Sequence, residues 1–193
     1  MTQHPNGVPV PGSLLQHDLL VMQQITSFNS NDMTILDPFE APIGHVVTKG
    51  SGAARFLMGS RELDLVDGDG TPLAHISDTI TFGRDRFEVT YPDGAPLAQV
   101  LKRMAFFTTK VEVNVADGSQ LQLNGNMFGF DFRFMLGEWE IASVSRQWAG
   151  MSKGLLGHSR YAIRMRSDAP DPVRRAIISC CVVLDLIREK ENR

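Results

Sequence analysis

The stretch from Pro172 to Arg188, PVRRAIISCCVVLDLIR, is the feature that most limits how this chain can fold. Asp171 followed by Pro172 indicates the start of a helix, because an Asp side chain caps free amides and proline suits the first helical position. From Ala176 to Leu184 every residue except Ser179 is apolar, so a helix here presents apolar side chains in all directions. Such a helix has to be surrounded on every side, either by lipid or by protein.

Length favours a surrounding of protein. A helix of roughly 17 residues is about 25 Å long, whereas a bilayer core needs about 30 Å and about 20 mostly apolar residues. The apolar part is about half of that, and Arg174 and Arg175 precede it while Asp185 and Arg188 follow it. We therefore expect a terminal helix at about 172–188 that is buried by the rest of the chain, with a membrane span as the alternative.

The preceding part of the chain has the pattern of β-hairpins. Asp-Gly pairs recur at 69–70, 93–94 and 117–118, each between two β-rich runs, and glycine supplies the positive φ that such turns need. Phe128, Phe130, Phe132 and Phe134 alternate with polar residues or glycine, which is the period of a strand with one apolar face. The predicted strands are Leu19–Gln24, Met33–Asp37, Ile43–Thr48, Glu62–Val66, Leu73–Ser77, Arg86–Tyr91, Leu97–Arg103, Thr108–Val115, Gln120–Leu123, Phe128–Leu136, Glu138–Gln147 and Tyr161–Arg166.

About twelve antiparallel strands and one apolar helix predict a mainly β fold, a closed antiparallel barrel around a central C-terminal helix. A barrel of this size leaves a bore that suits a helix, and closure removes the edges of the sheet. A sandwich with the helix outside is the alternative, but it needs a polar stripe on the helix, and only Ser179 offers one. We expect a flexible leader at 1–13 and a single domain at 14–193, with Trp139 and Trp148 packed in its core.

Composition excludes some functions. The net charge of −3 gives no general attraction to nucleic acid, although residues 146–193 hold 10 Lys and Arg against 5 Asp and Glu. That asymmetry indicates either chance sorting or a basic patch for anionic partners. Cys180 and Cys181 read as small core residues of a protein in the reducing cytoplasm. The sequence contains no recognisable set of catalytic acid, base and nucleophile. We therefore expect that the protein is not an enzyme and that it has no cofactor and no metal site.

Three stretches resemble the phospholipid scramblase family, which shares its barrel with the tubby-like proteins. They are LLQHDLLVMQQITSFNSN at 14–31, EIASVSRQWAG at 140–150 and AIISCCVVLDLI at 176–187. The resemblance implies a twelve-stranded barrel with the last helix threaded through its centre. It also implies a non-enzymatic protein that contacts phospholipid and moves it between leaflets. The family's acidic segment before the last strand corresponds here to LGHSRY at 156–161, which holds no carboxylate, so calcium dependence is not expected.

Basic residues beside aromatic ones supply the functional hypothesis. Lys102, Arg103, Arg146 and Lys153 are the candidate residues for lipid headgroups, since such cations are attracted to an anionic membrane surface. Anionic phospholipid is then the expected partner, at the inner face of the plasma membrane, and no protein partner can be named. Solvated charges at the ends of strands are the alternative for these residues. The alternative for the whole protein is a soluble barrel scaffold that binds a protein or a small ligand through its loops.

Overall fold

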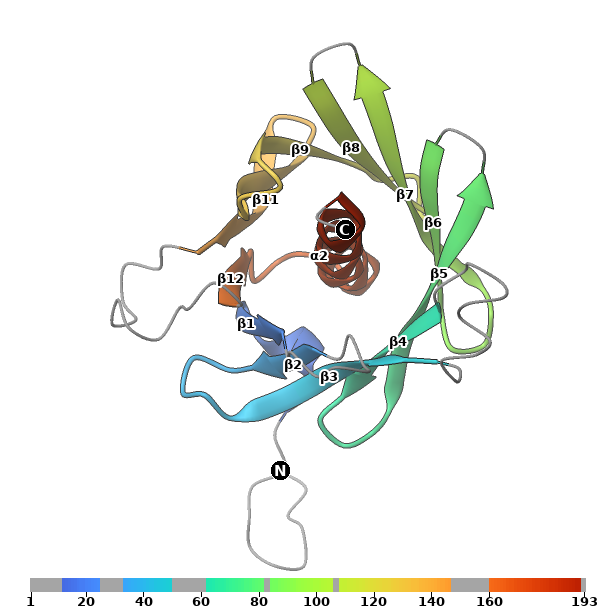
Figure 1. Cartoon of the computed structure of the whole chain (residues 1–193). Coiled ribbons are helices and arrows are strands. Elements are labelled where there is room, and N and C mark those ends of the chain that lie inside the picture. Colours follow the sequence, from blue (N-terminus) through green and yellow to red (C-terminus); the bar gives the residue numbers. More distant parts are fainter. Residues whose placement is uncertain are drawn as a thin grey trace, which may run out of the picture.

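The computed structural model describes residues 12–24, 33–49, 62–81, 84–105, 108–146 and 160–191, which form one barrel around one long helix (Figure 1). Its elements are the 3-10 helix η1 (Leu14–Gln16), the strands β1 (Leu19–Gln24), β2 (Met33–Leu36), β3 (Pro42–Thr48), β4 (Glu62–Asp67), β5 (Pro72–Thr81), β6 (Arg84–Thr90), β7 (Pro96–Ala105), β8 (Thr108–Val115), β9 (Gln120–Asn126), β10 (Asp131–Leu136), β11 (Trp139–Ser145) and β12 (Arg160–Met165), and the helix α2 (Asp171–Glu191).

The sheet closes because the first and last strands pair. β1 pairs antiparallel with β12, and each of the other neighbours along the sheet is also antiparallel and consecutive in sequence. The prediction of a closed antiparallel barrel of about twelve strands with a C-terminal helix is therefore confirmed, and no sheet edge remains between the described strands.

Four tight turns share one hydrogen-bond pattern, in which the first residue accepts from the fourth and donates to the fifth. They are the turns at 37–41, 67–71, 91–95 and 115–119. The fourth residue has a positive φ in each, 67° at Glu40, 90° at Gly70, 86° at Gly94 and 92° at Gly118. The three predicted Asp-Gly hairpins are thus present, and glycine stands where the backbone requires it.

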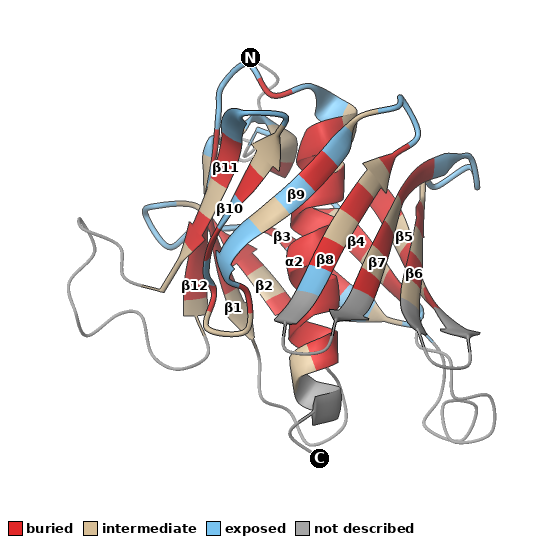
Figure 2. Ribbon diagram, turned by 90° about the horizontal axis from the view of Figure 1, so that it is seen from above, coloured by how far each residue is buried: buried red, intermediate tan, exposed pale blue. Residues whose placement is uncertain are grey.

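The core lies between the inner face of the barrel and α2. Inward side chains follow the register, with Leu20 opposite Ile163 and Val100 opposite Val113. Residues 176–184 of α2 are all buried, and Ser179 is 0% exposed, so the helix is covered on all sides (Figure 2). A sandwich with an outer helix is excluded by this burial.

Several boundaries differ from those predicted. The helix begins at Asp171 and not at Pro172, and the carbonyl of Pro170 accepts the first helical bond from the Arg174 amide. The Asp171 carboxylate lies 3.0 Å from Arg175 Nε, so it forms an ion pair one helical turn away. The short helix η1 was not predicted, and it lies in the described chain directly before β1.

Two expectations about aromatic residues are wrong. The strand predicted at Phe128–Leu136 begins only at Asp131, because Phe130 has a φ of 52° and belongs to the turn that precedes β10. Trp139 is 72% exposed at the turn between β10 and β11, so it is not a core residue. Trp148 lies outside the described residues.

The barrel has two distinct ends, named here as they lie in Figure 2. The upper end is where α2 begins, beside η1 and the tight turns. The lower end is where α2 finishes, and it contains the last residues of β7 and β11 and the turn at 127–130.

Candidate functional site

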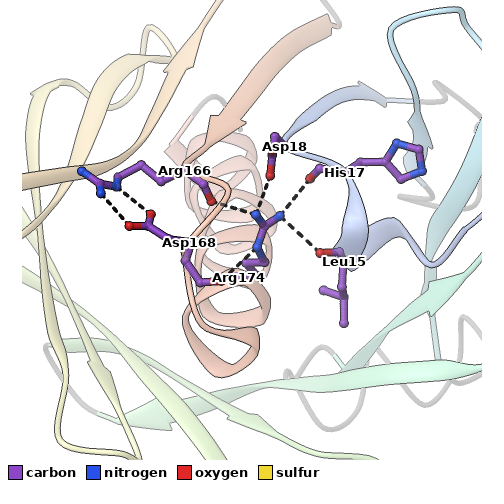
Figure 3. Close-up of polar contacts among 7 residues, drawn as sticks. Leu15, His17, Asp18, Arg166, Asp168 and Arg174 are labelled. Atoms are coloured by element: carbon purple, nitrogen blue, oxygen red, sulfur yellow. Dashed lines mark hydrogen bonds and ion pairs between the residues drawn. The ribbon is translucent and has the colours of Figure 1, made fainter.

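Arg174 is the centre of a polar network at the upper end (Figure 3). Its side chain is 7% exposed, and all five of its N–H groups have acceptors. Nε donates to the Ala169 carbonyl at 3.0 Å, and Nη1 donates to the carbonyls of Leu15 and His17 at 3.2 and 3.1 Å. Nη2 donates to Asp18 Oδ1 at 2.5 Å and to the Arg166 carbonyl at 2.7 Å. A single guanidinium thus ties the first turn of α2 to η1, to the approach to β1 and to the end of β12.

Further contacts close the same end. Asp67 Oδ1 accepts from the amide of Leu14 at 2.9 Å, which fixes η1 to the turn between β4 and β5. Arg175 Nη1 donates to the Leu73 carbonyl at 2.5 Å, which fixes α2 to the start of β5. These contacts tie η1, α2 and β5 together, so the polar groups that make them serve to close the upper end.

The lower end contains an aromatic pair with two arginines. Phe130 stacks on Tyr161 with centroids 4.0 Å apart and an interplanar angle of 18°. The guanidinium carbons of Arg146 and Arg188 lie 5.2 and 5.8 Å from the centroid of the Phe130 ring. Both distances are within the range of cation–π contact. Tyr161 Oη donates to the Cys181 carbonyl at 3.4 Å, which links this cluster to the middle of α2.

Burial shapes the electrostatics of this cluster. Desolvation is the main cause that lowers the pKa of Arg146, the positive charge of Arg188 lowers it further, and Asp185 opposes both. Burial also raises the pKa of Tyr161 well above its usual value, so its phenol stays protonated. The Arg146 Nε atom is buried and has no hydrogen-bond acceptor among the residues that the structure describes.

The four residues predicted from sequence lie in different surroundings. Arg146 is half-buried at the lower end, beside Phe130. Lys102 belongs to the end of β7, where its register with Val111 turns it into the barrel, and it is 8% exposed. Arg103 follows it in β7 opposite Lys110, and its side chain is not described. Lys153 lies outside the described residues.

Burial corrects one part of the sequence interpretation. A side chain that is 8% exposed presents almost no surface to a headgroup, so Lys102 acts at most through its charge. The alternation of Ala98, Val100 and Lys102 in the sequence carried this information, because residues two apart in a strand face the same side.

Two basic residues at the lower end were missed. In the sequence, Arg188 is only a charged residue that follows the apolar part of the helix, four residues after Leu184. Lys110 is exposed at the start of β8, opposite Arg103. No local sequence signal links Arg188 to Arg146, since their proximity follows from threading α2 through the barrel.

A groove of about 540 Å³ lies on the outer wall over β9, β10 and β11. Arg133 Nε and Glu140 Oε2 are 3.4 Å apart within it. The groove is lined by Asn124, Gly125, Asp131, Phe132, Arg133, Glu140, Ser143, Val144 and Ser145.

Within the described ranges, no group of three or more His, Cys, Asp or Glu side chains could hold a metal ion. Also among the described residues, no helix has the length and apolar character needed to cross a bilayer.

Twelve antiparallel strands closed around a C-terminal helix define this protein as a tubby-like barrel. A family model described as LURP-one-related matches residues 17–185, so the chain belongs to the LURP-one-related family. An X-ray structure of a protein from Arabidopsis thaliana is similar in fold, with a TM-score of 0.56 and 17% identity over 94% of this chain and 100% of that chain. No curated protein matches the sequence. The tubby-like fold expected from the sequence is confirmed, and the kinship with scramblases stays a prediction.

Proposed function

We propose that this protein is a non-enzymatic barrel that binds anionic phospholipid at a membrane surface through its lower end. The observation that carries the proposal is that basic residues gather at the lower end, whereas the tight turns of the upper end carry carboxylates. Arg146, Arg188 and the exposed Lys110 belong to the lower end, where the buried Lys102 adds its charge. Basic residues near an anionic leaflet each contribute about 1 kcal/mol of attraction.

The upper end has the opposite character. The turns at 67–71, 91–95, 115–119 and 136–139 contain five carboxylate residues and neither lysine nor arginine. Arg166, Arg174 and Arg175 also lie at this end, and each is paired with an aspartate. A molecule with this polarity is turned by an anionic surface so that its lower end faces the lipid.

The test is flotation with vesicles of phosphatidylcholine, with and without phosphatidylserine, at low ionic strength. Binding is expected only to the anionic vesicles, and it should weaken as salt screens the charges. Lys110→Glu should weaken it by about 2 kcal/mol, roughly 30-fold, since one attraction is lost and one repulsion gained. Arg133→Glu makes the same charge change on the outer wall and serves as the control. Absence of binding by the wild-type protein at low salt would remove the proposal.

Movement of phospholipid between leaflets is the stronger form of this proposal, and the resemblance to scramblases motivates it. Its test is the loss of protection of a fluorescent lipid in the inner leaflet of proteoliposomes, measured with and without calcium. Equal movement in both conditions is expected, because LGHSRY at 156–161 contains no carboxylate for calcium. No movement above protein-free vesicles would restrict the function to lipid contact.

A second candidate is a scaffold that binds a small polar ligand, and the outer groove favours it. Here the site is the wall over β9 to β11 and not the loops. Ser143→Trp would fill the groove, since Ser143 lines it. Loss of a ligand found in native extract, with vesicle binding unchanged, would support this candidate.

A further inference from the structure

Arg146 and Arg188 reach the same aromatic ring from two segments far apart in sequence. Arg146 follows β11 directly, and Arg188 is in the last turns of α2. Tyr161 stacks on the Phe130 ring with the two centroids 4.0 Å apart. The guanidinium carbons of Arg146 and Arg188 lie 5.2 and 5.8 Å from the centroid of the same Phe130 ring. The Phe130 ring therefore neighbours two like charges, and the charge of Arg188 acts on Arg146.

The position of Phe130 indicates that this arrangement is built into the fold. Its φ of 52° is rare for a large side chain and costs on the order of 1–3 kcal/mol. The turn nevertheless keeps this conformation, with the Phe130 amide donating to the Met127 carbonyl at 3.2 Å. The result is that the ring is 0% exposed beneath the two arginines.

Arg146 is incompletely compensated by the described residues. The desolvation of Arg146 and, after it, the repulsion from Arg188 both disfavour the charged form of Arg146. Asp185 is the carboxylate whose field acts on Arg146 in the opposite direction. The buried Nε of Arg146 still has no acceptor within the described chain, and a buried donor without an acceptor is destabilising.

An anion with several oxygens would compensate the positive charges of both arginines together. We propose that Arg146 and Arg188 jointly bind one phosphate group at the lower end of the barrel, with the Phe130 ring holding both guanidiniums in place. A guanidinium matches phosphate through two parallel hydrogen bonds, and a terminal phosphate monoester has three oxygens to share between two such forks. Both arginines are half-buried, so neither residue is wholly shut off from solvent.

This inference deepens the proposed function by naming the part of the lipid that is bound. Where the phosphate belongs to a lipid, the inference rests on the proposed function. Phosphate can come from a lipid headgroup or from a soluble phosphate monoester. Vesicles that contain phosphatidic acid present the first source, and glycerol 3-phosphate presents the second. Phosphatidylserine vesicles supply negative charge without a terminal monoester.

The decisive variant is Arg188→Gln, measured beside Arg146→Lys and the control Arg133→Gln. Arg188→Gln should lower affinity for phosphatidic acid vesicles at least about tenfold, because charge-assisted hydrogen bonds are lost. Arg146→Lys keeps the charge but removes the fork, so a clear loss is expected there too. Arg133→Gln should bind as the wild-type protein does, because Arg133 lies in the outer groove. The urea midpoint shows whether each variant is folded, and Arg188→Lys replaces Arg188→Gln if the latter is not.

The outcomes separate this inference from the proposed function. Vesicle binding that is the same in Arg188→Gln and in the wild-type protein overturns the phosphate site and leaves the proposed function standing. Binding of glycerol 3-phosphate that depends on Arg188, with no vesicle binding, supports the site and overturns the proposed function. Failure of the wild-type protein to bind either probe overturns both.

Discussion

Replacing Arg174 with methionine should destabilise the protein more than any other change of a single charged residue at the upper end. Methionine retains much of the length of the side chain but removes all five donated hydrogen bonds. The buried carbonyl of Ala169 loses its hydrogen-bond donor, and Asp18 loses its ion-pair partner. The first turn of α2 is then no longer fixed to η1.

The magnitude follows from burial. Hydrogen bonds to charged groups contribute about 1.5–3 kcal/mol each, but the five share one side chain and do not add. Asp18 is 51% exposed and is solvated once its partner is removed, so the loss comes from the carbonyls that no longer have a donor. A buried polar group left without a partner costs about 1–3 kcal/mol, and with several carbonyls affected the expected loss for Arg174→Met is about 2–4 kcal/mol. For a chain of this size it corresponds to a fall in Tm of about 4–16 °C.

Urea unfolding followed by far-ultraviolet circular dichroism measures the effect. Arg133→Met is the control, because its guanidinium is 67% exposed and pairs at 3.4 Å with Glu140. The free energy of unfolding of this control should change by no more than about 0.5 kcal/mol. A loss below about 1 kcal/mol for Arg174→Met would refute the role assigned to the network.

Three further predictions concern the wall, the helix and pH. Gly125→Ala should cost at least about 1 kcal/mol more than Gly94→Ala, because its Cβ would lie 2.7 Å from the Asp131 carbonyl oxygen whereas nothing lies within 4 Å at Gly94; equal urea midpoints would contradict this. Ser179→Ala should raise the free energy of unfolding by up to about 1 kcal/mol, because the hydroxyl is buried without an acceptor among the described residues, and a decrease would speak against that. Burial raises the pKa of Tyr161, so stability is fully present below about pH 10 and falls above it, where the unfolded chain releases the phenolic proton. Urea unfolding at several alkaline pH values should show that fall reduced in Tyr161→Phe.

Much of the fold could be predicted from the sequence because its signals are local. The apolar residues around all sides of 176–184 required an enclosure, and Asp-Gly pairs marked three hairpins of the barrel. The Arg174 network could not be predicted, since its acceptors in Leu15 and His17 are 159 and 157 residues away.

The candidate site was harder to predict than the fold. Phe130 continued a regular alternation of phenylalanines, and nothing in that pattern shows that its φ is positive. Arg146 was selected for its aromatic neighbour in sequence, but the ring it contacts is that of Phe130. Arg188 joins it only because α2 runs through the barrel and finishes at the lower end.

The enclosure of α2 by the barrel is tested most directly by native-state labelling of Cys180 and Cys181. Both thiols are 0% exposed, and burial raises the pKa of each, so neither should react with a thiol reagent while the protein is folded. The account predicts that labelling requires unfolding of the whole barrel, so the free energy of opening equals that obtained from urea unfolding. Labelling of either cysteine under native conditions at the rate of an unfolded peptide would contradict it.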